Sequence, residues 1–268
     1  MKISVFYDHI LNASKQTGKP VADILAEAAA AGIQAVELDL HNFSDTADHL
    51  KLIADAGISA ACINAHYSMD RAFDTAQAEA HIDAALRAGT NTILVVPGYL
   101  SEEEGAALGK VIHDKAATFS FLENCPAAVR IADGLTKIVA MASEKGVTVT
   151  IEDFDNTSSP LSGLNAMLWY LEKIPHLMCT FDTGNFITHG DDLFDAWEAL
   201  KDRVVHVHCK DRGEGVVSFG GGQLPCAEVL RKMKADGYEG FGAIEHYGAV
   251  DHLSCILRSA AYVKGLEL

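Results

Sequence analysis

The chain has 268 residues, of which 49% are hydrophobic and 22% are charged, so it is long enough to bury the core of one large α/β domain. Its formal net charge of −16, from 37 acidic and 21 basic residues, disfavours nucleic acid and anionic membranes as main partners. The six cysteines form no C-x-x-C pair, the N-terminus lacks the apolar region of a signal peptide, and no apolar run reaches the roughly 18 residues of a membrane span. We therefore expect a cytoplasmic protein without disulfides.

Strand-like and helix-like segments alternate from one end of the chain to the other. The expected strands are short apolar runs at 3–6, 35–38, 59–63, 92–96, 147–151, 178–181, 204–207 and 242–244. The expected helices lie at 21–31, 45–56, 75–88, 126–145, 160–173, 192–200, 226–236 and 250–264. Several of these helices are followed by glycine, which is a common helix stop. The stretch 99–124 is too long for a simple loop and predicts an inserted helical segment.

Eight strands alternating with eight helices predict an α/β protein, a single (β/α)8 TIM barrel. No break in composition marks a domain boundary, so residues 1–268 are expected to form one domain. An open doubly wound sheet is the structural alternative. Such a sheet would not normally need catalytic groups at the ends of four successive strands.

Four of the expected strands end in a side chain that can bind a metal or move a proton. These side chains are Glu152, Asp182, His208 and Glu245, and each is about one strand–helix unit from the next. Because the active site of a TIM barrel lies at the carboxyl ends of its strands, we expect all four at one place. Three crowded carboxylates need a cation, and an oxygen-rich site with one imidazole suits Mn, Mg or Co, with Zn possible.

Four motifs resemble those of the xylose isomerase-like barrel superfamily of sugar isomerases and epimerases, which is related to endonuclease IV. They are Ile151-Glu152, Phe181-Asp182-Thr183-Gly184-Asn185, His206-Val207-His208-Cys209-Lys210-Asp211 and Ile244-Glu245. The resemblance covers essentially the whole chain. It implies that Glu152, Asp182, His208 and Glu245 bind one divalent metal ion, with Mn preferred, and that the protein is a homo-oligomer. It also implies that the two glutamates act as an acid/base pair, as in the ketose 3-epimerases.

The residues alone support the same chemistry. A metal that bridges a sugar carbonyl and the neighbouring hydroxyl would stabilise the enediolate formed when the C–H proton leaves. Glu152 is the candidate base, and Glu245 is the candidate acid that returns a proton from the other face. We therefore expect a sugar or sugar-phosphate isomerase or epimerase, and the sequence does not separate isomerisation from epimerisation.

Four further residues are predicted to contact the substrate: His66, Asn185, Lys210 and Arg212. Two positions depart from the family pattern. Asn185 stands where the family often has histidine, and Ser158 stands where the ketose 3-epimerases carry a second glutamate. The glycine run 220–222 follows the seventh expected strand, where barrels often bind phosphate through backbone N–H groups.

Three other functions stay open. A dehydratase of a polyol or inosose would share the first proton abstraction and then expel the β-hydroxyl group. An endonuclease IV-like repair enzyme would need more histidines and a basic face, which the net charge of −16 disfavours. A non-catalytic binding barrel would have no need for both glutamates.

Overall fold

A computed structural model describes residues 1–43 and 46–268, the side chains of 46–48 excepted. Helices and strands alternate along the described chain, and its internal contacts divide it into two compact units. Unit 1 comprises Met1–Ile63, Arg87–Thr90 and His206–Leu268, and unit 2 comprises Asn64–Leu86 and Asn91–Val205. Each unit is described by itself below.

Unit 1 holds the first and the last elements of the chain. They are β1 (Lys2–Phe6), α1 (Tyr7–Thr17), α2 (Val21–Ala31), β2 (Ala35–Asp39), η1 (Leu40–Phe43), α3 (Thr46–Asp55), most of β3 (Ser59–His66) and of β7 (Val204–Cys209), α10 (Cys226–Ala235), β8 (Phe241–Ile244) and α11 (His252–Gly265).

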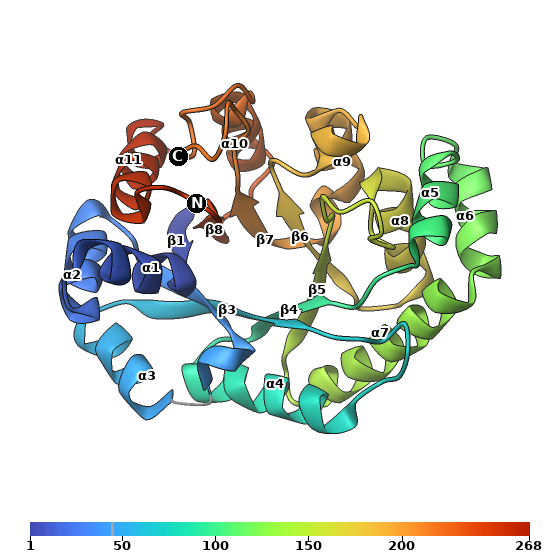
Figure 1. The fold of residues 1–268 in the computed structure, drawn as a ribbon, viewed down its shortest axis with the longest axis horizontal. Coiled ribbons are helices and arrows are strands. Elements are labelled where there is room, and N and C mark those ends of the chain that lie inside the picture. Colours follow the sequence, from blue (N-terminus) through green and yellow to red (C-terminus); the bar gives the residue numbers. More distant parts are fainter. Residues whose placement is uncertain (44–45) are drawn as a thin grey trace. The chain divides into compact units, whose positions relative to one another are not determined.

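The strands of unit 1 are parallel and buried. β1 pairs with β2 on one side and with β8 on the other, with Val5 opposite both Val36 and Ile244. β7 pairs with β8, with His208 opposite Ala243. Helix α1 packs against α2 and α11, as the blue and red ribbons of Figure 1 show. Because the strands run in the same direction, their carboxyl ends lie at one edge.

Unit 2 holds the middle of the chain. Its elements are most of α4 (Thr75–Ala88), β4 (Thr92–Val96), α5 (Glu102–Gly109), α6 (Lys115–Asn124), α7 (Pro126–Glu144), β5 (Thr148–Glu152), α8 (Gly163–Lys173), β6 (Met178–Asp182), η2 (Phe186–His189), α9 (Leu193–Leu200) and η3 (Lys201–Arg203).

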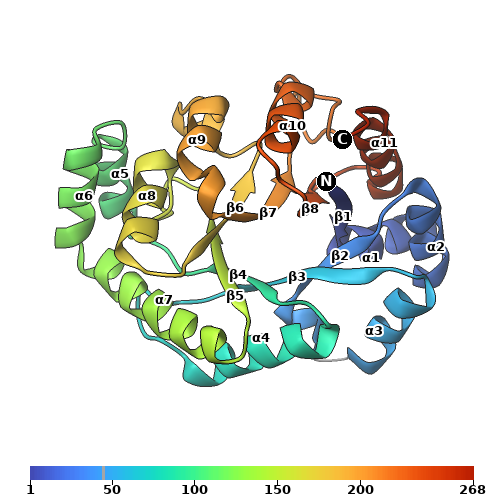
Figure 2. The same ribbon diagram turned by 180° about the vertical axis from the view of Figure 1, so that it is seen from behind.

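Strand β5 lies between β4 and β6 in unit 2. The β-branched run of β5 is buried, and its Thr150 hydroxyl donates to the Ile93 carbonyl (3.0 Å) and accepts from the Thr180 hydroxyl (2.8 Å). These bonds satisfy polar groups that would otherwise be costly in a core. Helix α7 packs on β5, and α6 packs against α7 and α8 (Figure 2).

The stretch 99–124 contains the two helices α5 and α6. Helix α5 begins with a capping box, in which the Glu104 amide donates to the Ser101 hydroxyl (3.2 Å) and the Ser101 amide donates to the Glu104 carboxylate (2.9 Å). Helix α6 is capped by Asp114. That residues 1–268 form a single domain stays a prediction. Among the described residues no helix is long and apolar enough to cross a membrane, and the six cysteines are free thiols.

The largest differences between the structure and the predicted elements lie in three places. Helix α1 was not predicted, because it follows β1 without a loop and its apolar positions are few. Strand β3 runs to His66, beyond the predicted end at residue 63, and α8 begins at Gly163 instead of residue 160. The predicted helix 45–56 corresponds to α3, and its first residue lies outside the described residues.

Candidate active site

Unit 2 brings Glu152 and Asp182 together. They are the last residues of the adjacent parallel strands β5 and β6. A carboxylate oxygen of Glu152 lies within 4.8 Å of one of Asp182, and both side chains are buried. The Asp182 carboxylate also accepts the Gly184 amide at 2.6 Å. We call these two residues the carboxylate pair, because two such negative charges close together favour a bound cation.

A third carboxyl group lies next to the carboxylate pair in unit 2. Asp153 is fully buried, and its Oδ1 accepts the Gly163 amide at 2.8 Å. Burial raises the pKa of Asp153 well above its usual value, and the charges of Asp182 and Glu152 add to this effect, while the Gly163 amide opposes it only in part. Ionisation of Asp153, which would add a further negative charge at this end of β5, is therefore unfavourable. Asn185, predicted to contact substrate, is buried here and donates its side-chain amide to the Asp153 carbonyl (2.7 Å).

Unit 1 brings His208 and Glu245 together. His208 is near the end of β7, Glu245 follows β8 directly, and the Glu245 amide donates to the Cys209 carbonyl at 3.2 Å. His208 Nδ1 lies 3.4 Å from Glu245 Oε2, and Lys210 Nζ lies 2.8 Å from Glu245 Oε1. We call His208 and Glu245 the imidazole–carboxylate pair. Lys210, predicted as a substrate contact, is in this structure an ion-pair partner of that glutamate.

Glu37 in β2 supports the imidazole–carboxylate pair. Its Oε2 accepts from His208 Nε2 (3.1 Å) and from His206 Nε2 (2.8 Å), and all three side chains are buried. Burial alone would raise the pKa of Glu37, but the charges and hydrogen bonds of His208 and His206 outweigh it and lower that pKa well below its usual value. Glu37 therefore stays ionised and fixes the His208 ring through Nε2.

Glu37 is a candidate functional residue that was not predicted from the sequence. The signal was a glutamate inside the apolar run Ala35-Val36-Glu37-Leu38, because a charge is rarely buried without a partner. The sequence does not show which partner it meets. His206, two residues before His208, shares its strand face and its carboxylate.

The two remaining predicted substrate contacts lie in different units. In unit 2, His66 ends β3 with an exposed ring whose centroid is 6.4 Å from that of Phe154. In unit 1, Arg212 is half-buried, and its backbone amide donates to Asp211 Oδ1 at 2.8 Å. Their contacts with a substrate stay predictions.

The glycine run 220–222 does not present its amides as a phosphate loop would. The amides of Gly220 and Gly222 donate to Asp211 Oδ2 at 3.1 and 2.8 Å, and the Gly221 amide donates to the Ser218 carbonyl at 2.8 Å. A carboxylate of the chain itself thus accepts the Gly220 and Gly222 amides, which a phosphate would otherwise need.

Both pairs have donor atoms that suit a divalent metal ion. The carboxylate pair offers two oxygen ligands, and the imidazole–carboxylate pair offers one oxygen and one imidazole nitrogen. His208 has the arrangement typical of a metal-ligating histidine, in which one ring nitrogen is held by a carboxylate. An oxygen-rich set of ligands of this kind suits Mn or Mg, whereas a closed structural zinc site normally contains cysteine ligands.

Comparison with known proteins places the chain in a family. The family described as "Xylose isomerase-like TIM barrel" matches residues 25–267. An uncharacterised protein of Methanocaldococcus jannaschii is 24% identical over 173 residues, which are 62% of this chain and 54% of that protein. The chain thus spans about half the length of this relative.

Two solved structures are similar over nearly the whole chain. The probable 3-DHS dehydratase AsbF of Bacillus anthracis, involved in petrobactin synthesis, has a TM-score of 0.75 and 16% identity, with 98% of this chain and 99% of that chain covered. An L-ribulose 3-epimerase has a TM-score of 0.71 and 19% identity, with 100% and 95% covered. At such identities these similarities show the fold, and they confirm the predicted (β/α)8 barrel. The chain belongs to the xylose isomerase-like TIM barrel family.

Proposed function

We propose that the carboxylate pair and the imidazole–carboxylate pair together hold one divalent metal ion. The protein would then be a metal-dependent isomerase or epimerase of a small sugar or sugar phosphate. The order of the strands supports this proposal, because β5 to β8 are consecutive along the chain. In a TIM barrel the carboxyl ends of consecutive parallel strands meet at the face that carries the active site.

The observation that carries the proposal is the setting of His208. Its Nε2 is bonded to the buried carboxylate of Glu37, and its Nδ1 faces Glu245. A carboxylate behind the ring fixes the tautomer and makes the other nitrogen a better metal ligand. A histidine that served only packing would not need a buried charge to orient it.

The two glutamates are the candidate acid and base. A bound divalent metal supplies Lewis-acid stabilisation of the negative charge that develops on the substrate oxygens. Glu152 would take the proton from the carbon next to the carbonyl. Glu245 would return a proton, either to the other face of the same carbon in epimerisation or to the adjacent carbon in isomerisation.

The two oxygens of Glu245 have different neighbours. Oε2 faces His208 Nδ1, whereas Oε1 accepts from Lys210 Nζ. The first oxygen is therefore the candidate metal ligand and the second is the candidate proton carrier. In this arrangement Lys210 would orient Oε1 and supply positive charge beside the substrate.

A dehydratase is the second candidate, favoured by the similarity to the probable dehydratase AsbF at a TM-score of 0.75. Dehydration uses the same proton abstraction by Glu152 and differs in the next step, where the β-hydroxyl group leaves. Ser158, at the position where a ketose 3-epimerase carries glutamate, also argues against that narrower activity.

One screen separates these candidates. The purified protein with added Mn²⁺ would be incubated in D2O with ketoses, aldoses, their phosphates and cyclic polyol ketones, and followed by NMR. We expect deuterium to enter one substrate carbon as a new isomer or epimer accumulates. Accumulation of an unsaturated product would establish the dehydratase instead.

Metal analysis provides the second measurement. We expect about one divalent ion per chain, and turnover that a chelator removes and Mn²⁺ restores. Turnover that persists unchanged in chelator, or three ions per chain, would contradict the proposal.

A further inference from the structure

The segment that follows β8 carries Glu245 but has no regular structure of its own. β8 contains only four residues, Phe241–Ile244, and the chain does not become helical again until α11 begins at His252. Within residues 245–251 the Ala249 amide donates to the His246 carbonyl (3.2 Å), and the other contacts described below come from elsewhere in unit 1. Any contact that fixes this backbone also fixes the carboxylate of Glu245.

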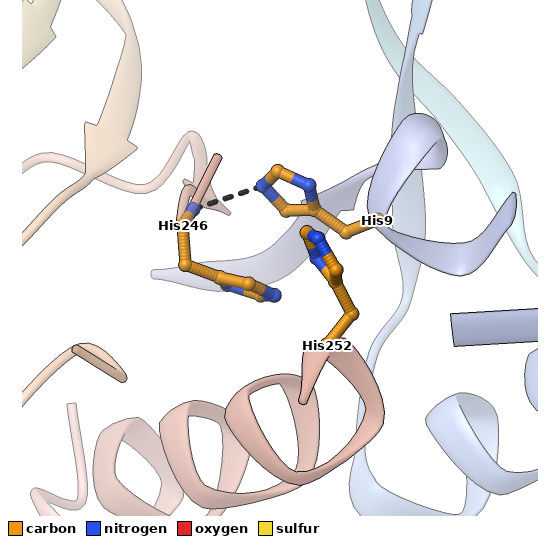
Figure 3. Close-up of side chains that lie close together, drawn as sticks. All are labelled: His9, His246 and His252. Atoms are coloured by element: carbon orange, nitrogen blue, oxygen red, sulfur yellow. Dashed lines mark hydrogen bonds between the residues drawn. The ribbon is translucent and has the colours of Figure 1, made fainter. Parts of the chain in front are cut away.

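In the first such contact, a side-chain nitrogen accepts a backbone amide that a carbonyl of the neighbouring strand would normally accept. The Glu245 amide donates to the Cys209 carbonyl of β7, so the next amide along an extended chain points to the other neighbour, β1. β1 ends at Phe6, where α1 begins. His9 in the first turn of α1 takes the place of the missing strand carbonyl, because its Nε2 accepts the His246 amide at 2.9 Å (Figure 3).

The second contact comes from the same helix two turns later. The Gln16 side chain donates from Nε2 to the Ala249 carbonyl (3.1 Å) and accepts the His252 amide at Oε1 (2.9 Å). His9 and Gln16 are seven positions apart, which is about two helical turns, so they lie on the same face of α1. We call His9 and Gln16, together with the backbone of 246–252 that they bond, the α1 clamp.

The hydrogen bond of His9 determines its tautomer. Nε2 accepts an amide proton, so it carries no proton of its own, and in the neutral ring the proton is on Nδ1. Burial, followed by the neighbouring His246 and His252 rings, lowers the pKa of His9 well below its usual value, which keeps the ring neutral. His9 is completely buried, so no water competes for the bond.

His9, His246 and His252 also form a cluster in which one ring nitrogen of each lies within 4.8 Å of one ring nitrogen of each of the others (Figure 3). The His9 and His246 rings pack with centroids 4.1 Å apart at an angle of 31°. A metal-ligating histidine normally donates its second N–H to an acceptor. His9 does the opposite, since its Nε2 receives a donor, and the arrangement therefore suits a ring that anchors backbone better than a metal ligand.

We propose that His9 and Gln16 are positioning residues, which hold the Glu245 carboxylate in its working position by bonding the backbone that follows it. This inference rests on the proposed function, in which Glu245 is both a metal ligand and the proton donor. Small displacements of a reacting group by remote changes can lower a rate by about 100-fold.

The test compares four variants of the 268-residue chain loaded with Mn²⁺. His9→Leu removes the acceptor, whereas His9→Gln keeps a side-chain oxygen that can accept the His246 amide. Gln16→Leu removes the second contact, and because Gln16 is exposed its loss does not open the core. His113→Leu is the matched control, since its ring is 61% exposed and lies in unit 2.

Hydrogen exchange followed by mass spectrometry measures the clamp without any substrate. We expect amides in the peptide covering 245–252 to exchange at least about tenfold faster in His9→Leu and Gln16→Leu, and at the wild-type rate in His9→Gln and His113→Leu. Unchanged exchange in His9→Leu and Gln16→Leu would show that the clamp does not hold this segment.

Kinetics then measure the effect on Glu245. At saturating Mn²⁺ we expect kcat of His9→Leu to fall by about 10- to 100-fold with KM within about twofold, and His9→Gln to recover most of the loss. A wild-type kcat in His9→Leu, or no rescue by glutamine, would overturn the positioning role. If His9→Leu does not fold, Gln16→Leu decides. Absence of turnover in the wild type would contradict the proposed function, while the exchange data would still decide the clamp.

Discussion

The carboxylate pair of unit 2 and the imidazole–carboxylate pair of unit 1 are held in different ways. In unit 1, Glu37 bonds His208 from behind and Lys210 pairs with Glu245. In unit 2, Glu152 and Asp182 lie close together, next to Asp153, whose burial raises its pKa. The imidazole–carboxylate pair of unit 1 is thus organised by hydrogen bonds and an ion pair, whereas unit 2 concentrates negative charge.

This difference separates two requirements of a metal centre. Ligands must be oriented before the metal binds, and their charge must be compensated once it has bound. In the proposed metal centre, the buried anion Glu37 and the cation Lys210 would meet the first requirement in unit 1. The crowded carboxylates of unit 2 provide the charge that a divalent cation would neutralise. Variants in the two units should therefore fail in different ways.

The largest effect is expected from Glu152→Gln, which removes the candidate base and one charge of the carboxylate pair. We expect kcat to fall by about 10²- to 10⁴-fold, because that is the usual contribution of a positioned general base. Incorporation of solvent deuterium at the substrate carbon, measured by NMR, should disappear while circular dichroism stays unchanged. Glu103→Gln, on the exposed first turn of α5, is the matched control and should leave kcat and deuterium incorporation unchanged. Full exchange in Glu152→Gln would show that another group is the base.

A smaller effect is expected from Glu37→Gln, which removes the negative charge behind His208 and leaves every candidate ligand in place. Glutamine keeps the volume but loses the charge that orients His208, so Mn²⁺ affinity measured by calorimetry should fall by about 10- to 100-fold. His206→Gln should weaken binding less, because the bond between Glu37 and His208 remains. Glu123→Gln, an exposed change on α6, serves as control. Equal Mn²⁺ affinity in Glu37→Gln and wild type would remove Glu37 from the metal centre.

The strands of the fold, and the side chains at their ends, were predictable because both leave local signals. An apolar run that stops at Glu152 or Asp182 marks a strand and a rim position in a few adjacent residues. The helix α1 left a weaker signal, since it is mostly polar and its buried face is completed by α2 and α11. Its role in bonding residues 246–252 depends on contacts more than 230 positions apart in the chain.

Partners of buried polar groups were the part that the sequence could not predict. Glu37 is separated from His206 and His208 by 169 and 171 positions, and only the pairing of the strands decides that they meet. The glycine run 220–222 follows β7, where barrels often bind phosphate, yet Asp211 accepts two of its amides. Residue types indicate which chemistry is possible, and tertiary contacts decide which group satisfies it.

The smallest effect is expected from Asp153→Asn, and it tests the charge of unit 2 through stability. The folded-state pKa of Asp153 is raised, so the unfolded chain releases this proton more easily as the pH rises above about 4. Asp153 therefore lowers the free energy of unfolding at pH 7 and has no such effect below the unfolded-state pKa. Asparagine keeps an oxygen for the Gly163 amide without the charge. In chelator at pH 7, urea unfolding should therefore give a larger free energy of unfolding for the variant than for the wild type.

The pH and the metal provide the controls for this last comparison. The stability difference between Asp153→Asn and wild type should vanish near pH 3, where Asp153 is protonated in both the folded and the unfolded states. Saturating Mn²⁺ at pH 7 should reduce the difference in unfolding free energy between variant and wild type. The reason is that a cation on Glu152 and Asp182 would offset their charges, which add to the effect of burial in raising the Asp153 pKa. Asp133→Asn, an exposed change on α7, should show neither dependence. A difference that Mn²⁺ leaves unchanged would mean that the charge crowding at the end of β5 is not coupled to a bound metal.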